Sequence, residues 1–178
     1  QAPGYRLAVP PDAIDLVRVD TSVDDALAAQ RAGAHERAIA LLADALAASE
    51  RPPLPECADR PFGVALTARW TARRGAALEA LVEAQLALGR HAEVAATLPA
   101  QLAPFPHRER LHGHLALALY RCGRQVDALR TIDAVRRALA EDVGVSLSPE
   151  LATLEARILD HDPSLDGRPP QADTSATA

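Results

Sequence analysis

Apolar residues recur every three or four positions along most of the chain, which is the spacing that places them on one face of an α-helix. Thr21 or Ser22 is expected to cap the first helix, and Ser148 followed by Pro149 the last. The first predicted helix runs from just after Asp20 to Gly33, and the second from there to a proline-rich loop at 49–61. The third covers 62–88, with an irregularity near Gly75, and the fourth about 91–101. The last three run from 107 to Gly123, from there to Gly144, and from 149 to Asp162.

Three of the predicted turns share one pattern. Each contains a glycine, a small or β-branched residue five positions later and a large aliphatic residue nine positions later. The three sets are Gly33, Ala38 and Leu42; Gly89, Val94 and Leu98; and Gly123, Ala128 and Ile132. Gly89 and Gly123 are 34 residues apart, which is the period of a tetratricopeptide repeat. The proline-rich loop accounts for the longer interval between the first two glycines.

This pattern has a physical reason. Two antiparallel helices need a glycine in a tight turn, a small residue where their backbones approach, and an aliphatic side chain to fill the groove between them. One such pair cannot bury its apolar face alone, so pairs stack on one another. The sequence therefore predicts an all-α fold, a tetratricopeptide-like right-handed stack of antiparallel helix hairpins. Such stacks are typically used to present a surface to another protein.

The two ends of the chain do not follow the helical pattern. Tyr5 and Leu7 alternate with smaller or polar residues, as in a β-strand, and Pro10 and Pro11 prevent the strand from continuing. The start of the chain therefore reads as one half of a β-hairpin ahead of an otherwise helical chain. Residues 163–178 are poor in apolar side chains and are expected to form a disordered linker. The chain contains no Met, so residue 1 is not expected to be an encoded start.

Charge is distributed unevenly over the 178 residues. All 19 basic residues are arginines, and the net charge is −5. Residues 60–137 carry a net charge of +6, whereas the segments before and after them are acidic. The basic middle could favour an acidic partner or a phosphate backbone, and the candidate partner-binding residues are Arg73, Arg74, Arg108 and Arg110. The alternative is that exposed helix faces alternate in sign.

No group of residues indicates catalysis. The chain lacks a phosphate-binding loop with lysine, a Gly-x-Ser-x-Gly motif and a His-Glu-x-x-His motif. His107 and His114 share a predicted helix face but have no further metal ligand at a suitable spacing, and Trp70 is expected to anchor the core. Cys57 and Cys122 are isolated thiols, which fits a reducing cytoplasm. No signal peptide or membrane span is predicted, and we expect no catalytic residue, cofactor or metal.

The stretch "PHRERLHGHLALALYRCGRQVDALRTIDAVRRALAEDVGVSLSPELATLEARILDHDPSL" resembles the signature half of the bacterial transcriptional activator domain. This helical domain is found in the Streptomyces antibiotic regulatory protein family, whose members regulate transcription and secondary metabolism. The resemblance extends more weakly back to Asp15. It implies a helical activator domain over 15–162, and a remnant of a winged-helix DNA-binding domain over 1–14. Gly4, Tyr5 and Leu7 match the Gly-Tyr-x-Leu end of the last wing strand.

The resemblance also implies a function. We expect a non-enzymatic domain of a transcriptional activator that helps to recruit RNA polymerase, supports contacts with another copy of itself, or relays signals from modules beyond the linker. Promoter DNA would be bound only through the winged-helix domain. The alternatives are a generic tetratricopeptide-like scaffold and a domain that senses a small molecule in an arginine-lined groove.

Overall fold

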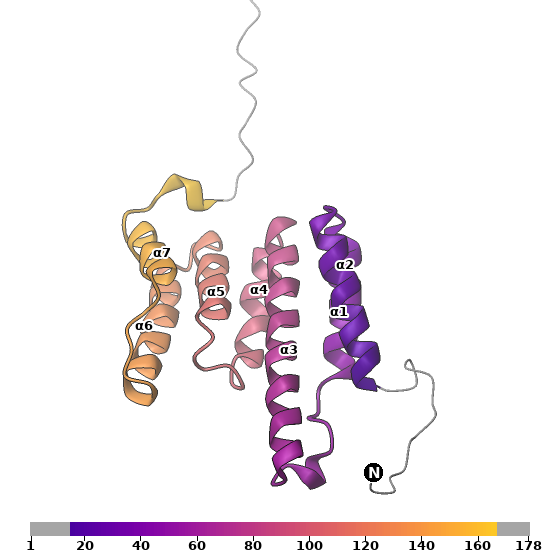
Figure 1. Ribbon diagram of the computed structural model, residues 1–178. Helices are drawn as coiled ribbons and strands as arrows, with labels where there is room; N and C mark the ends of the chain where they lie inside the picture. Colours follow the sequence, from indigo (N-terminus) through magenta and orange to yellow (C-terminus); the bar gives the residue numbers. More distant parts are fainter. Residues whose placement is uncertain (1–14, 167–178) are drawn as a thin grey trace, which may run out of the picture. The chain divides into compact units, whose positions relative to one another are not determined.

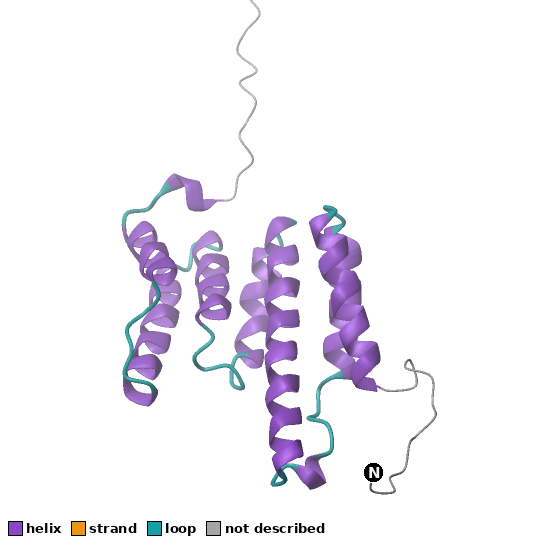
Figure 2. Ribbon diagram, in the orientation of Figure 1, coloured by secondary structure: helices purple, strands orange, loops and turns teal. Residues whose placement is uncertain are grey.

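The computed structural model describes residues 15–166, and every regular element within that range is a helix (Figures 1 and 2). Gly4, Tyr5 and Leu7 lie outside the described residues. The chain divides into two compact units after Leu88. The first unit contains α1 (Asp15–Arg31), α2 (His35–Ala48), the short 3-10 helix η2 (Pro55–Cys57) and α3 (Pro61–Ala87); the second contains α4 (His91–Thr97), η3 (Leu98–Gln101), α5 (Glu109–Arg121), α6 (Gln125–Asp142), α7 (Pro149–Leu159) and η4 (Pro163–Asp166).

In the first unit, α1 and α2 form a hairpin around Gly33. This glycine has φ +76°, in the left-handed region that side chains with a Cβ rarely adopt. The backbone N–H of Gly33 donates to the carbonyl of Gln30, and the N–H of the next residue donates to the carbonyl of Ala29, each at 2.9 Å. These two bonds end α1 in a Schellman motif. Ala38 and Leu42 are fully buried where α2 returns along α1.

The first helix begins earlier than the sequence predicted. α1 starts at Asp15, so Thr21 lies inside the helix and is not a cap. The Thr21 hydroxyl instead donates to the carbonyl of Val17, one turn back, at 2.9 Å. The expectation failed because Thr side chains bond equally well to a preceding helical carbonyl. α3 also differs from the prediction: it continues through Gly75, which is buried, without interruption.

The proline-rich loop between α2 and α3 is held against the start of α3. A Cβ on Gly63 would lie 1.8 Å from the carbonyl oxygen of Cys57. This close approach of two backbones requires glycine. Phe62 and Val64, on either side of Gly63, are both 57% exposed. The first turn of α3 therefore packs against η2 through its backbone and leaves apolar side chains on the surface.

In the second unit, α5 and α6 form a hairpin with the same geometry as the first one. Gly123 has φ +74°, and its N–H and that of Arg124 donate to Tyr120 and Leu119, again at 2.9 Å. Ala128 and Ile132, five and nine positions after the glycine, are fully buried. α4 packs against α5, and α7 packs against both α5 and α6.

The last helix begins and ends as local sequence signals require. The Ser148 hydroxyl accepts a hydrogen bond from the N–H of Leu151 at 3.3 Å, as expected of a cap. The chain then turns back into η4, where Leu165 is buried and its carbonyl accepts a 2.6 Å hydrogen bond from Nε of Arg121. Helical structure thus extends to Asp166, four residues into the segment expected to be a linker.

Candidate protein-interaction site

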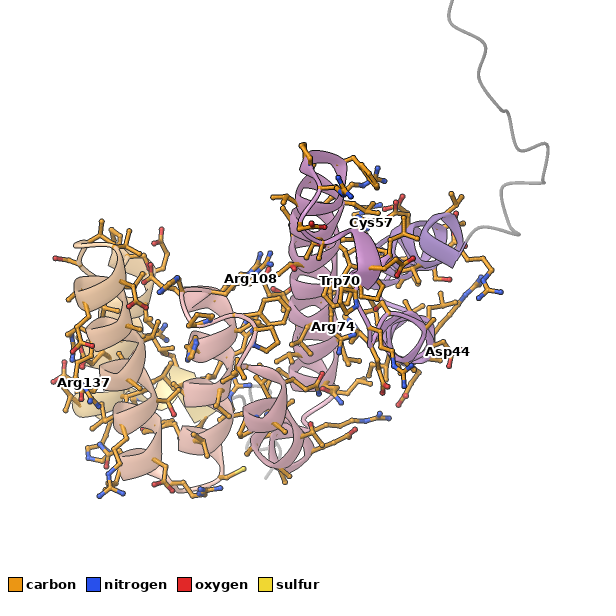
Figure 3. All side chains as sticks on the ribbon, turned by 90° about the horizontal axis from the view of Figure 1, so that it is seen from below. Asp44, Cys57, Trp70, Arg74, Arg108 and Arg137 are labelled. Atoms are coloured by element: carbon orange, nitrogen blue, oxygen red, sulfur yellow. The ribbon has the colours of Figure 1, made fainter. Side chains whose placement is uncertain are left out.

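One face of α3 carries an aromatic side chain and two arginines that contact the rest of the first unit. Leu66, Trp70, Arg73, Arg74 and Ala77 are spaced at four, seven, eight and eleven positions, so they share one side of the helix. This side faces α1 and the end of α2, as seen for Trp70 and Arg74 in Figure 3. The face therefore decides how α3 joins the first hairpin.

Arg73 ties α3 to α1. Its Nε lies 3.1 Å from Oδ1 of Asp20, it pairs with Asp24, and one terminal nitrogen donates to the backbone carbonyl of Asp20 at 2.8 Å. Arg69 adds a second ion pair to Asp20 at 2.6 Å, although its own side chain is 74% exposed. A cluster of two arginines and two carboxylates thus joins the helices at the edge of the apolar core.

Arg74 ties α3 to the end of α2. Its Nη1 donates to the backbone carbonyls of Leu46 at 2.7 Å and Ser49 at 2.9 Å. These carbonyls lie at the end of α2, where the regular helical hydrogen bonds run out. The Leu46 carbonyl also accepts from the N–H of Ser49 at 3.2 Å. The guanidinium also lies 5.9 Å from the centroid of the Trp70 ring. Burial lowers the pKa of Arg74, while the charge of Glu50 acts in the opposite direction.

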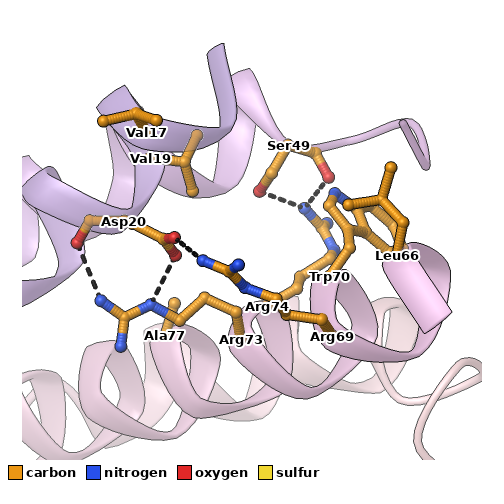
Figure 4. A pocket seen from close by; sticks show the side chains of 10 residues that line it. All are labelled: Val17, Val19, Asp20, Ser49, Leu66, Arg69, Trp70, Arg73, Arg74 and Ala77. Atoms are coloured by element: carbon orange, nitrogen blue, oxygen red, sulfur yellow. Dashed lines mark hydrogen bonds and ion pairs between the residues drawn. The ribbon is translucent and has the colours of Figure 1, made fainter. Parts of the chain in front are cut away.

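These side chains surround a cavity of about 190 Å³ (Figure 4). Val17 and Val19 line it from α1, and Leu66 and Trp70 from α3. A second, more open hollow of about 420 Å³ shares Val19 and Trp70 with the first and continues past Pro52 and Pro53 of the proline-rich loop. The half-buried indole therefore forms a common wall, and the two hollows together make one trough, which we call the Trp70 trough.

The second unit has an apolar groove of its own, between α5 and α7. It has a volume of about 440 Å³ and is lined by Leu117, Leu151 and Leu154. Gly113 also lines it, and a Cβ there would lie 3.4 Å from the Leu151 side chain. Arg110, Glu109 and Glu150 also line it. We call this feature the α5–α7 groove.

The structure places the four candidate arginines in different settings. Arg73 and Arg74 both make contacts within the first unit, as described above. Arg108 lies at the start of α5, where its guanidinium is 5.9 Å from the centroid of the Phe105 ring, and Arg110 lines the α5–α7 groove. Intramolecular bonding does not exclude partner binding, which stays a prediction for all four.

No metal-binding arrangement is found in residues 15–166. No group of three potential ligands among His, Cys, Asp and Glu is close enough together to hold a metal ion in this range. His107 instead bonds to Asp142, with Nε2 2.8 Å from Oδ2. Burial lowers the pKa of His112, partly offset by its hydrogen bond with the Phe105 carbonyl. Cys57 and Cys122 are both free thiols.

None of the helices described is both long and apolar enough to span a bilayer.

Sequence reasoning missed Asp20, Ser49 and Trp70 as parts of one site. Trp70 was expected to anchor the core, but it is only half-buried and lines the trough. The available signal was the spacing of Trp70, Arg73 and Arg74, which places an aromatic ring and two cations on one helical face. The partners on α1 and α2 had no such signal, because they depend on which helices meet.

Comparison with known proteins identifies several relatives. Residues 14–159 match the family model described as bacterial transcriptional activator domain. The transcriptional regulatory protein EmbR of Mycobacterium tuberculosis is 34% identical over 174 residues, which cover 98% of this chain and 45% of EmbR. The regulatory protein AfsR of Streptomyces griseus is 47% identical over 87 residues, 49% of this chain and 9% of AfsR. The transcriptional regulator RedD of Streptomyces coelicolor is 33% identical over 162 residues, 91% of this chain and 46% of RedD.

A solved structure shares the fold. The structure of Mycobacterium tuberculosis EmbR in complex with a low-affinity phosphopeptide matches with a TM-score of 0.83 and 33% identity. The match covers 93% of this chain and 45% of that one. Together with the all-helical residues 15–166, it confirms the all-α, tetratricopeptide-like class expected from the sequence. The chain spans less than half the length of the relatives it matches.

Proposed function

Because this chain belongs to the bacterial transcriptional activator domain family, we propose that it is the non-enzymatic protein-interaction domain of an activator of the Streptomyces antibiotic regulatory protein type. The relatives named above are transcriptional regulators, which supports a role in transcription control. The proposed setting is the cytoplasm, where promoters and polymerase are accessible.

The observation that carries the proposal is the α5–α7 groove within the region that matches the family model. Grooves between helices are a common docking site for a partner helix, whose apolar side chains fill them. Arg110 supplies positive charge beside Glu109 and Glu150, which also line the groove, and Arg108 lies two residues before Arg110. The proposed partner is an apolar segment of RNA polymerase that places an acidic side chain toward Arg110. A second copy of the chain is the alternative occupant of the groove.

Promoter DNA would be bound elsewhere in the longer protein. We propose that a winged-helix domain precedes residue 15 and that Gly4, Tyr5 and Leu7 belong to its last strand. The helical domain would then act after DNA binding, by bringing polymerase to the promoter. This order predicts that damage to the α5–α7 groove affects activation and leaves DNA binding unchanged.

The test is a reporter assay with the whole regulator. Arg108→Glu combined with Arg110→Glu should lower activation about ten-fold, which corresponds to about 1.4 kcal/mol of lost contact energy. DNA binding, measured by gel shift, should stay unchanged. The matched control is Arg130→Glu combined with Arg137→Glu, because both side chains lie on α6 and are 78% and 64% exposed. Equal activation by both double variants would contradict the proposed role of the groove.

A generic scaffold would behave differently in the same assay. Deleting the helical domain would leave transcription unchanged if the domain were a generic scaffold. If it is an activator domain, the same deletion should abolish activation and leave DNA binding intact. A small-molecule sensor is less well supported near Arg73 and Arg74. The enclosed cavity that these two arginines line is about 190 Å³, below the range of about 300–1,000 Å³ that is usual for small-molecule sites. The open hollow beside it is about 420 Å³, but neither Arg73 nor Arg74 lines it.

A further inference from the structure

The Trp70 trough is lined by apolar and charged side chains, and no described residue covers it. Val17 at its edge is 37% exposed, although it lies in the first turn of α1 and beside the core. Trp70 is half-buried and borders both hollows. A trough of this shape is too narrow at its enclosed end for a typical small ligand, but it suits individual side chains of an extended segment. The question is therefore which segment fits.

The chain itself supplies a candidate of suitable composition. Residues 8–14, with the sequence AVPPDAI, immediately precede α1. Proline-containing extended segments dock on grooves lined by aromatic side chains because they are already stiff and offer few N–H groups that need partners. Pro10 and Pro11 fit this description. On these grounds, we propose that residues 8–14 dock in the Trp70 trough, with the proline pair against the indole.

Chain connectivity supports this occupant over a foreign one. Ile14 lies three positions before Val17, and Val17 and Val19 already line the enclosed cavity. Pro11 is separated from Asp15 by only a few residues, so an extended chain could place it up to about 14 Å from the helix start. A tethered segment has a high effective concentration at such a distance. It can therefore occupy the trough even if each individual contact is weak.

Charge is also compatible with this segment. Arg69 lies on the wall of the enclosed cavity and its side chain is 74% exposed, and Arg51 lines the open hollow. Asp12 is the only charged residue in 8–14. Glu50 also lines the open hollow and opposes an acidic group at that end. The carboxylate of Asp12 is therefore expected at the Arg69 end, and the prolines nearer to Pro52 and Pro53.

Docking would give the segment a mechanical role. It would fix the direction in which the chain enters α1, and so orient whatever lies upstream relative to the first helical unit. If the upstream part is a winged-helix domain, which rests on the proposed function, the docked segment would set the orientation of that DNA-binding domain relative to the first helical unit. The docking itself does not depend on that function.

Trp70 is the only tryptophan in the chain, so its fluorescence reports directly on the trough. The test compares the full 178-residue chain with a variant that combines Pro10→Ser, Pro11→Ser and Ile14→Ser. The variant should show about a two-fold higher acrylamide quenching constant and a red-shifted emission, because a segment that is docked most of the time shields the indole. The matched control is Pro169→Ser with Pro170→Ser, which changes a second proline pair and should leave quenching unchanged.

A second measurement does not depend on the stability of the triple variant. A photoreactive benzoylphenylalanine placed at position 9 of the full chain should form an intramolecular cross-link to peptides that contain Trp70 or Pro52. Cross-links between two copies, or to other surfaces, would overturn the proposal. So would equal quenching in the full chain and the triple variant. Both measurements use the chain without DNA or polymerase, so their failure would leave the proposed role in transcription intact.

Discussion

The two helical hairpins are built alike, but the third helix joins each of them differently. The α1–α2 and α5–α6 turns use the same glycine conformation and the same pair of hydrogen bonds, and the buried positions after each glycine correspond. α3 then joins the first hairpin through arginines that bond to carboxylates and carbonyls. α7 joins the second through buried Leu151 and Ile158. Two side chains of α6 add polar bonds: Arg136 pairs with Glu155, and Gln125 donates to the carbonyl of Ile158.

This difference shows which features of the fold are local along the chain and which depend on tertiary contacts. The hairpin is a local unit, and its turn and core positions recur at fixed spacing. The attachment of the next helix is a tertiary contact, and polar and apolar solutions both serve. The attachment of α3 leaves the half-buried Trp70 and a trough beside it. The attachment of α7 leaves the α5–α7 groove. The following predictions test whether the hairpins are equivalent and the attachments are not.

The largest effect is expected from emptying the hairpin cores. Leu42→Ala and Ile132→Ala should each lower the free energy of unfolding by about 2–5 kcal/mol, because both side chains are fully buried and leave a cavity. Urea unfolding followed by circular dichroism measures the loss. Val126→Ala is the control, since Val126 lies on α6 but is 62% exposed. A large loss at one core position and almost none at the other would show that the hairpins are not equivalent.

Substitutions where α3 attaches to the first hairpin should lower the free energy of unfolding less than the core substitutions. Arg74→Ala removes a donor from the carbonyls of Leu46 and Ser49 and should cost about 1–3 kcal/mol, because the Ser49 carbonyl loses its bond to a charged donor and the Leu46 carbonyl keeps only the N–H and hydroxyl of Ser49. Arg69→Ala should cost at most about 1 kcal/mol, since its ion pair is exposed. Chemical denaturation of both variants tests this ranking. Equal losses would mean that surface charge, and not the bonds to the end of α2, holds α3 in place.

Two glycines should respond with opposite signs. Gly123→Ala should cost about 1–2 kcal/mol, because a residue with a Cβ is strained at φ +74° even where space is free. Gly113→Ala should gain up to about 1 kcal/mol, because alanine is a better helix former and the nearest side-chain atom is 3.4 Å away. Thermal unfolding of the two variants decides this. A destabilised Gly113→Ala variant would show that α7 packs on α5 more tightly than these distances indicate.

The smallest effect concerns pH and the second unit. Burial lowers the pKa of His112, and burial together with the charge of Arg121 lowers that of His91. In the unfolded chain both groups titrate near about 6.5. Their contribution to stability is therefore complete above that pH and is lost as the pH falls through the lower folded values. The double variant His91→Gln with His112→Gln should show a smaller loss of stability between pH 7.5 and 5 than the unaltered chain.

Local signals in the sequence were sufficient for much of the fold. The positions of Gly33 and Gly123, with Ala38 and Ala128 five residues later, correctly placed two hairpin turns, since a Schellman motif is completed by residues within one turn. Ser148 and Pro149 correctly marked the start of α7 for the same reason. The start of α1 could not be found this way, because Thr21 can cap a helix or bond to a preceding carbonyl, and only the longer helix decides between them.

The candidate sites depended on contacts between distant segments. Arg73 and Arg74 could be selected as cations on one helix, but not as partners of Asp20 and of the carbonyl at Leu46. The Trp70 trough likewise requires α1, the proline-rich loop and α3 to meet. No spacing along the chain encodes such a meeting.

The sequence by itself determined where this chain turns and which side chains each hairpin buries, because glycine conformation, capping and helical periodicity act over a few residues. The tertiary structure decided how α3 and α7 attach, what Arg73 and Arg74 bond to, and which hollows remain open. Those outcomes depend on the shapes and charges of surfaces that come together only after the helices have formed.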